Sequence, residues 1–415
     1  MSVRRGQLQL LRVAVVAVCL LMIAAATEPA APEGSALPSA RGSVVRTGPL
    51  AALATGSGRV VPFPHAAGIN ALVDAIVADG SGGWFIGGGF DSLGGFRCLS
   101  IAHVLATRQV DRKWCPRLTP EGGTVDVGVS AIARRGQELF IGGSFSFVDG
   151  ERRAGIAAVA LASGRVLPWR APHLCSYPGS TCRYTGADGQ ANVIVIRRNA
   201  VYFTGGFARV NQQARFRYAA ADLASGKLLP WNPDARIPSP RTSWRHTLSA
   251  AAHALFTTAD FTRIGGASRN GFAALDYVSA QAKPLRLSMT PCSNTNLVVA
   301  YGRIYVSTCG ADPNASPCAV AAFDSTNGQP IQWRPSLPED THPYLCDEPI
   351  AAIAHSIYIH RSFGDLEGWR PLIRVDATTG QTVGNEHLFN GAVFASAPAG
   401  GAILVGGDFT AVRPR

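Results

Sequence analysis

Acid–base chemistry near neutral pH needs carboxylates and an imidazole in one cavity, and this 415-residue chain offers three candidates, Asp74, His246 and Glu348. Each stands within or next to a short apolar run, and four other polar residues hold a comparable position. The full set is Asp74, Ser130, Asn192, His246, Thr295, Glu348 and Asn390. At one mouth of a channel, these residues could bind a small polar ligand or a cation, or supply a hydrolase or lyase with an acid and a base. They could also cap strand ends by bonding neighbouring backbone amides.

The candidates share a position because the chain is built from a repeat. Its clearest mark is an apolar run that ends on a glycine pair and an aromatic residue, as in residues 139–145 (LFIGGSF). Variants end at Phe90, Phe145, Phe207, Phe261, Phe363 and Phe409, and a degenerate copy ends at Gly310. The steps between these anchors are 46 to 62 residues, which is the spacing of propeller blades rather than of helical repeats.

One repeat unit predicts four antiparallel strands, at residues 129–133, 139–143, 155–159 and 165–169. Pro168 is acceptable in the fourth because an edge strand lacks a partner on one side. The last repeat ends after two strands, and residues 46–63 align with 152–169, so the missing half lies at the N-terminus. We therefore predict an all-β fold: a seven-bladed β-propeller of four-stranded antiparallel blades, with the ring closed by N-terminal strands that complete the C-terminal blade.

Two further residue types recur at fixed places in the repeat. Trp169, Trp231 and Trp333 each lie five residues beyond a turn glycine, which favours packing between blades over ligand binding. An arginine precedes the third strand, where we expect it to pair with carboxylates or carbonyls of the next blade. The members of this set are Arg46, Arg97, Arg152 or Arg153, Arg269 and Arg370.

The repeat resembles the delta-60 repeat β-propeller family. The matching segments are VSAI at 129–132, GERR at 150–153, AALD at 273–276 and GGDF at 406–409, and the resemblance covers nearly all of residues 45–415. It implies an exported or surface-exposed protein with no established catalytic activity, and it supplies no active-site residues.

The N-terminus predicts export. Arg4, Arg5 and Arg12 precede an apolar run from Val13 to Ala26, which indicates a signal peptide over residues 1–26. The alternative is a retained anchor, although the run is short for a membrane span. Residues 27–44 are rich in Ala, Pro, Ser and Gly and predict a flexible linker, which leaves residues 45–415 for the propeller.

Composition argues against nucleic acid as a partner. The net charge is +11, but lysine is nearly absent and the arginines are scattered singly or in pairs, with no tract that could track a phosphate backbone. The adjacent pairs after the presequence are Arg134-Arg135, Arg152-Arg153 and Arg197-Arg198. The sequence indicates no cofactor. We expect a monomer with no membrane span after signal cleavage, and a protein or polysaccharide partner.

Eight cysteines follow the signal peptide, and in an exported chain an even number predicts disulfides. Eight cysteines allow 105 pairings. Spacing favours Cys98 with Cys115, Cys175 with Cys182, Cys309 with Cys318, and Cys292 with Cys346. A metal site would need clustered Cys and His residues, and the sequence has no such cluster.

Long loops identify the expected working face. Turns after strands one and three are short, whereas the segments after strands two and four are long, as in residues 171–190. Because binding concentrates in long loops on rigid scaffolds, we expect a binding or interaction scaffold that works through this face. The alternative is a propeller enzyme with a site at the channel mouth. Residues 322–328 are similar to the tryptophan-docking repeats of quinoproteins, but no adjacent cysteine pair accompanies them.

Overall fold

The computed structural model describes residues 43–414, except for residues 70, 122–126, 171, 177–188, 238–246, 289–295, 309–318, 336, 338–346, 362–367 and 385. Residues 41–415 form one compact unit. Its described secondary structure is entirely β, as predicted. None of the described segments forms a helix long and apolar enough to cross a membrane.

The described strands form eleven antiparallel sheets, of which seven contain the repeated strands and follow one another along the chain; we name each of these by its innermost strand. Six of them begin with three consecutive strands, and the last of the six pairs further with β33(His387–Phe389), β36(Ala411–Pro414) and β1(Val45–Arg46). The six sets of three are β5(Leu72–Ala78), β6(Trp84–Gly89) and β9(Ile101–Val104); β11(Gly128–Arg135), β12(Glu138–Ser144) and β15(Ile156–Ala160); β17(Gln190–Arg197), β18(Ala200–Gly206) and β21(Tyr218–Asp222); β22(Ser249–Ala250), β23(Leu255–Thr258) and β26(Phe272–Leu275); β27(Leu297–Ala300), β28(Arg303–Thr308) and β29(Ala319–Asp324); and β30(Asp347–Ile353), β31(Ser356–Arg361) and β32(Arg370–Asp376).

The seventh sheet combines the two ends of the chain. It runs β3(Val60–Val61), β2(Leu50–Ala54), β35(Ala402–Gly407) and β34(Val393–Ala399), and Leu50 lies opposite Gly406. N-terminal residues therefore supply the two outer strands to C-terminal residues, as the alignment of residues 46–63 predicts.

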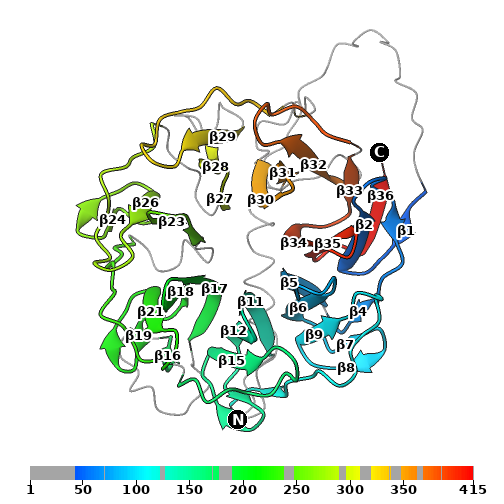
Figure 1. Cartoon of the computed structure of the whole chain (residues 1–415), viewed down its shortest axis with the longest axis horizontal. Coiled ribbons are helices and arrows are strands. Elements are labelled where there is room, and N and C mark those ends of the chain that lie inside the picture. The colour runs from blue at the N-terminus through cyan, green and yellow to red at the C-terminus, as the bar shows by residue number, and fades with distance from the viewer. Residues whose placement is uncertain are drawn as a thin grey trace, which may run out of the picture. The chain divides into compact units, whose positions relative to one another are not determined.

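Each innermost strand contacts the innermost strand of the next sheet. The contacts run from β5 to β11, β17, β22, β27, β30 and β34, and β34 contacts β5 again. Figure 1 shows these strands facing a common centre, with the later strands of each sheet farther out. This radial arrangement of repeated antiparallel sheets is a β-propeller fold.

The glycine pair of the repeat is required by two close approaches. A Cβ on Gly142 would lie 2.6 Å from the carbonyl oxygen of Ala191, which belongs to the neighbouring β17. A Cβ on Gly143 would lie 1.9 Å from the carbonyl oxygen of Gly128 in its own sheet. That second contact falls beside a β-bulge in β11, where the register shifts between Val129 and Ala131. The missing side chain at Gly142 therefore lets the next sheet approach closely, and the missing side chain at Gly143 leaves room for the bulge in β11.

Tryptophans join neighbouring sheets, as predicted. The indole Nε1 of Trp169 donates to the carbonyl oxygen of Asp222 in the next sheet, at 3.2 Å, and its ring meets Phe140 of its own sheet edge-on. Trp231 and Trp333 make the equivalent bonds to Asp276 and Asp376, at 2.9 and 3.1 Å. Recurrence of one bond at one position in several sheets supports the packing interpretation.

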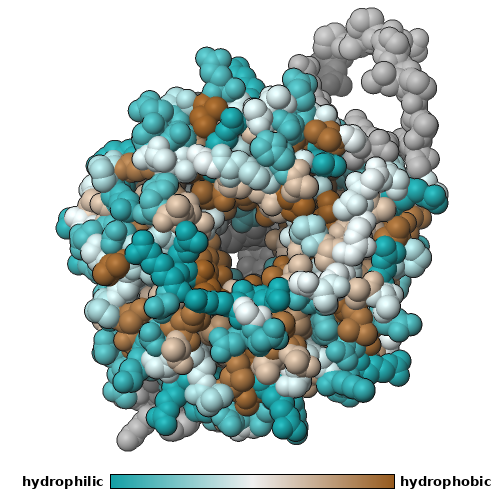
Figure 2. Space-filling model, in the orientation of Figure 1, coloured by the Kyte–Doolittle hydropathy of each residue, from teal (hydrophilic) through white to brown (hydrophobic). Residues whose placement is uncertain are grey.

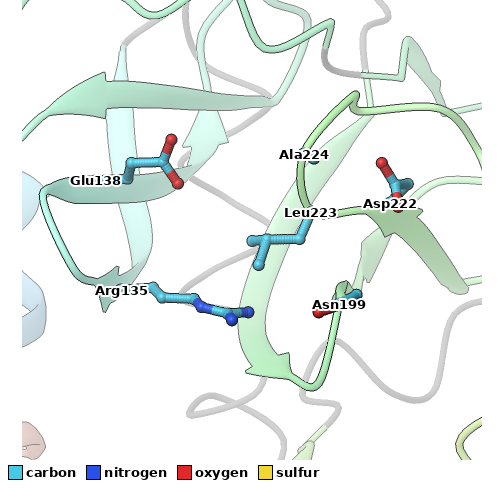
Figure 3. A pocket seen from close by; sticks show the side chains of 6 residues that line it. All are labelled: Arg135, Glu138, Asn199, Asp222, Leu223 and Ala224. Carbon is cyan, nitrogen blue, oxygen red and sulfur yellow. The ribbon is translucent and has the colours of Figure 1, made fainter.

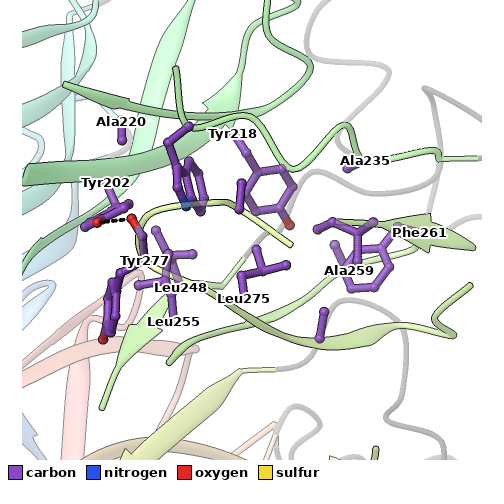
Figure 4. Packing of buried hydrophobic residues seen from close by; sticks show 14 of the residues in the cluster. Tyr202, Tyr218, Ala220, Ala235, Leu248, Leu255, Ala259, Phe261, Leu275 and Tyr277 are labelled. Carbon is purple, nitrogen blue, oxygen red and sulfur yellow. Dashed lines mark hydrogen bonds between the residues drawn. The ribbon is translucent and has the colours of Figure 1, made fainter. Parts of the chain in front are cut away.

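The hydrophobic clusters lie between sheets, as Figure 4 shows for one of them. Tyr202 and Tyr218 of the β17 sheet pack there against Leu255 and Tyr277 of the β22 sheet region. The hydroxyl of Tyr202 donates to the carbonyl oxygen of Tyr277, at 2.7 Å. Each sheet thus stabilises its neighbour through apolar contacts and a small number of hydrogen bonds.

The fourth strand of the repeat is shorter than the sequence predicted. In the β11 sheet it is reduced to one bridge between Val159 and Val166, and five other sheets have the same single bridge. Pro168 has no backbone N–H to continue the ladder, and Trp169 turns toward the next sheet. Among the described residues, the β34 sheet has a two-residue strand, β3, at the position predicted for the fourth strand.

Two adjacent glycines in β18 test the close-approach requirement. A Cβ on Gly205 would lie 2.0 Å from the carbonyl oxygen of Gln190, whereas a Cβ on Gly206 would meet nothing within 4 Å. We expect Gly205→Ala to lower the free energy of unfolding by about 2–3 kcal/mol. Gly206→Ala serves as the matched control and should change it by less than about 0.5 kcal/mol. Equal effects in denaturant titrations would contradict this account.

Candidate functional site

The long segment after the second strand was expected to form part of the working face, but where the structure describes it, its strands pair in β-hairpin fashion. In three sheets this hairpin pairs with the strand that enters the sheet, and in the β22 sheet it forms a single bridge to the entering segment. In the β34 sheet the equivalent pair of strands comes from opposite ends of the chain. The strands are β4(Ala66–Ala67), β7(Ser92–Leu93) and β8(Phe96–Arg97); β10(Leu118–Thr119), β13(Phe147–Val148) and β14(Glu151–Arg152); β16(Leu174–Cys175), β19(Arg209–Val210) and β20(Gln213–Ala214); β24(Arg263–Ile264) and β25(Ala267–Ser268); and β33(His387–Phe389), β36(Ala411–Pro414) and β1(Val45–Arg46).

The hairpin tips lie against the outer edge of their own sheets. The carboxylate of Asp149, at one tip, accepts a hydrogen bond from the backbone N of Val166 at 3.0 Å. At another tip, Gly265 accepts from the backbone N of Ala282 at 2.9 Å. Strands β7, β8, β19 and β24 accordingly lie at the periphery in Figure 1. The hairpins therefore cover the edges of the sheets, and only the connections between sheets remain to form the expected long-loop face.

In three sheets, a buried or half-buried arginine fixes the hairpin to its sheet. Arg153, Arg215 and Arg269 stand eight residues after the anchors Phe145, Phe207 and Phe261. Their guanidinium groups donate to the carbonyl oxygens of Leu167 (3.1 Å), Leu229 (3.5 Å) and Lys283 (2.6 Å), in each case fourteen residues further on.

These arginine bonds stay within one sheet, which corrects the expectation that the arginine pairs with the next blade. The structure also decides between Arg152 and Arg153, because Arg152 forms an ion pair with Glu121 instead. Arg215 was not in the predicted set, although the constant spacing from the anchor aromatic could have identified it. Arg46 and Arg97, which were in the set, are exposed. Burial lowers the pKa of Arg215 and Arg269.

A disulfide occupies the arginine position in the β5 sheet. Cys98 stands eight residues after Phe90 and is bonded to Cys115, as predicted. Cys175 is also disulfide-bonded, and its expected partner Cys182 lies outside the described residues. The pairs Cys292 with Cys346 and Cys309 with Cys318 lie outside them as well. One covalent bond thus replaces the arginine-to-carbonyl bonds of the other sheets.

Removing this disulfide tests the equivalence. The bond closes a loop with a sequence separation of 17, so the double substitution Cys98→Ser with Cys115→Ser should lower the free energy of unfolding by about 3 kcal/mol. Cys98→Arg with Cys115→Ser places an arginine where Arg153 stands, and it should recover about 1 kcal/mol through a carbonyl bond. Denaturant unfolding measures both. An arginine variant no more stable than the serine variant would refute the equivalence.

The predicted channel-mouth ring is only partly assembled. Asp74, Ser130 and Asn192 are the bulge residues of β5, β11 and β17, so they occupy equivalent positions. All three are half-buried, and the Oδ1 atom of Asn192 is buried with no hydrogen-bond partner among the described residues. His246 and Thr295 lie outside the described residues.

The register corrects the other two positions. In β30 and β34 the bulge residues are Ile350 and Phe394, not Glu348 and Asn390. Glu348 lies two residues earlier in β30, and Asn390 precedes β34, where it bonds Thr410 and Ala411. The alignment failed here because these two sheets carry apolar residues at the bulge. The equivalent positions therefore do not form a continuous polar ring.

Figure 2 shows a central hollow bordered by apolar side chains, with hydrophilic ones among them. The described residues contain no group of three or more His, Cys, Asp or Glu side chains that could hold a metal ion. Asp74 and Glu348 are also offset along their strands, so their placement gives no support to an acid–base pair.

A different acid–base constellation lies in the β5 sheet, and no motif or spacing in the sequence pointed to it. His103 of β9 places Nδ1 at 3.1 Å from Asp111 and Nε2 at 3.2 Å from Asp79, and its ring stacks on Phe85 with centroids 4.4 Å apart. Burial raises the pKa of Asp79, but hydrogen bonds from Ser81, His103 and Gly83 outweigh it and lower that pKa to about 2.

The lowered pKa of Asp79 predicts a pH-dependent stability. Its contribution is complete above the usual pKa of 3.8 and is lost as the pH falls toward about 2. Asp79→Asn should therefore lower the free energy of unfolding at pH 7 by about 2 kcal/mol, with the difference from wild type shrinking between about pH 4 and 2. Asp234→Asn, at an exposed site, is the control. A difference that stays constant down to pH 2 would contradict the assignment.

A surface pocket lies at the opposite end of the sheets from the long connections. It has a volume of about 300 Å³ and is lined by Arg135 and Glu138 of one sheet and by Asn199, Asp222, Leu223 and Ala224 of the next (Figure 3). These residues belong to short turns after first and third strands or stand next to them. The sequence had directed attention to the other face, because it identified long loops rather than spaces between short turns.

No protein-family model matches the chain, and no curated protein matches it in sequence. Among solved structures, the WD40 β-propeller domain of Doa1 is similar over 84% of this chain and 94% of that chain, with 11% identity and a TM-score of 0.47. BamB from Moraxella catarrhalis covers 89% of this chain and 94% of its own, with 14% identity and a TM-score of 0.43. The Dos1 propeller is similar over 85% of this chain and 94% of its own, with 10% identity and a TM-score of 0.42. Similarity at this level transfers no function.

Proposed function

We propose that this chain is an exported interaction scaffold: a closed seven-bladed β-propeller of the delta-60 repeat family, with residues 1–26 as signal peptide and 27–44 as linker. The observation that carries the closed ring is the sequence of neighbour contacts, which returns from β34 to β5. The pairing of β2 with β35 supports it. So does Gly406, where an added Cβ would lie 2.3 Å from Val73 of β5.

The binding surface of this scaffold is the face that carries the long connections between sheets. The hairpins pack on the sheet edges, whereas the connections are long segments on the same face. Long loops on a rigid scaffold are the usual place for binding residues. Asp74, Ser130 and Asn192 lie at the same ends of their strands, so a partner held by the connections would also meet these polar side chains. Disulfides near the connections, such as Cys98–Cys115, favour a rigid surface suited to an oxidising compartment.

Replacement of one connection tests the proposed face. A variant with residues 177–188 exchanged for a short glycine-serine linker, and with Cys175→Ser, should lose partners that the full-length chain recovers from the exported fraction. A chain carrying Cys175→Ser alone is the matched control. Recovery of the same partners by all three chains would contradict the assignment. The mass of the recovered chain tests export, because cleavage should remove residues 1–26.

A further inference from the structure

Four exposed arginines gather on the face with the short turns, opposite the proposed scaffold surface. Arg134 and Arg135 end β11, and Arg197 and Arg198 follow the same path at the end of β17. Because β11 and β17 are neighbouring strands, the two arginine pairs lie close together on the face with the short turns. We call this set the arginine arc.

Contacts across sheets hold the arc in place. Arg134 lies over Gly80 of the β5 sheet, where an added Cβ would come within 2.4 Å of Nη1. Arg135 donates to the carbonyl oxygen of Arg198. The guanidinium of Arg198 lies over the ring of Tyr277, beyond β26, at 5.5 Å from its centroid. These contacts extend over four consecutive sheets, from β5 to β22. Because they hold the guanidinium groups in place, less conformational entropy is lost when the arc binds an anion.

The arc carries more positive charge than its acidic neighbours balance. Among the described residues, none of the four arginines forms an ion pair. Asp222 and Asp276 lie in nearby turns, where hydrogen bonds from Ser225 and Ser279 lower the pKa of both carboxylates. Both aspartates therefore stay negatively charged and offset part of the charge of the arc. Glu138 is the one other acidic residue in the pocket, and it is half-buried.

Aliphatic side chains border the arc. Leu223 lies in the 300 Å³ pocket beside Arg135 (Figure 3). At either end, in turns after third strands, Leu105 is 37% exposed and Val278 is 74% exposed. Sugars and bases favour flat aromatic surfaces, whereas leucine and valine suit the apolar side chains of a polypeptide.

We propose that the arginine arc and the adjoining pocket bind an extended acidic segment of a partner protein, in which carboxylates alternate with apolar residues. The carboxylates pair with the guanidinium groups of Arg134, Arg135, Arg197 and Arg198, and an apolar side chain seats against Leu223. This site is independent of the long-connection face, so either proposal can fail without the other.

Peptide binding to the full-length protein tests the site. The probe is a fluorescent (Glu-Glu-Leu)4 peptide, compared with (Glu-Glu-Ser)4, (Lys-Lys-Leu)4 and heparin by anisotropy at physiological salt. Arg→Gln at 134, 135, 197 and 198 should weaken binding of (Glu-Glu-Leu)4 at least about tenfold. The matched control changes four exposed arginines of the hairpin side to glutamine, Arg97, Arg117, Arg236 and Arg263, and should stay within about twofold.

Two further variants sharpen the result. Glu138→Gln removes one of the two carboxylates that line the pocket, the other being Asp222, and should tighten binding about twofold. Arg134→Gln with Arg197→Gln leaves Arg135 and Arg198 in place and should weaken it about threefold if the fourfold variant does not fold. Equal loss in the control, failure of (Glu-Glu-Leu)4 to bind, equal binding of (Glu-Glu-Ser)4, or tighter arc-dependent binding of heparin would each overturn the proposal.

Discussion

The fold depends on how closely the innermost strand of one sheet can approach the second strand of its neighbour. A side chain at Gly142 would meet the backbone of Ala191, and one at Gly406 would meet Val73. Glycine at this position brings the sheets into contact, so that the aromatic and aliphatic clusters between them can close. Tryptophan Nε1 bonds to the next sheet then fix the angle of contact farther out. A larger residue in place of Gly142 or Gly406 would push the two sheets apart and weaken the apolar clusters and the tryptophan hydrogen bonds between them.

Several sheets lack glycine at this position, and the β22 sheet shows one way to replace it. Thr257 and Thr258 of β23 are buried, and their hydroxyls bond Thr247, while Tyr218 of the preceding sheet bonds Thr257 at 2.9 Å. Burial raises the pKa of Tyr218 to about 12, so the phenol stays neutral and keeps its hydrogen bond. A satisfied polar cluster thus takes the place of close backbone packing, and β22 shortens to Ser249–Ala250.

Much of the architecture could be read from the sequence, because the repeat marks the same physical requirement several times. The strands, the interblade tryptophans and the pairing of Leu50–Ala54 with β35 all follow from it. Contacts between residues that do not belong to the repeat could not be predicted from the sequence. The His103 constellation joins side chains from two strands and a turn of one sheet, and the arginine arc arises because Arg135 and Arg198 meet across two sheets. The polar ring failed at Ile350 and Phe394 because these two sheets carry apolar residues at the bulge, and spacing alone does not reveal which residue lies there.

Closure of the propeller by its N-terminal strands is the central claim, and amide hydrogen exchange tests it most directly. Strand β2 (Leu50–Ala54) is buried between β3 and β35, although only a short stretch of described chain precedes it. Its amides should exchange as slowly as those of β12 (Glu138–Ser144), because both open only when a blade unfolds. Exchange of the β2 amides within seconds, as in a frayed terminus, would contradict closure of the ring.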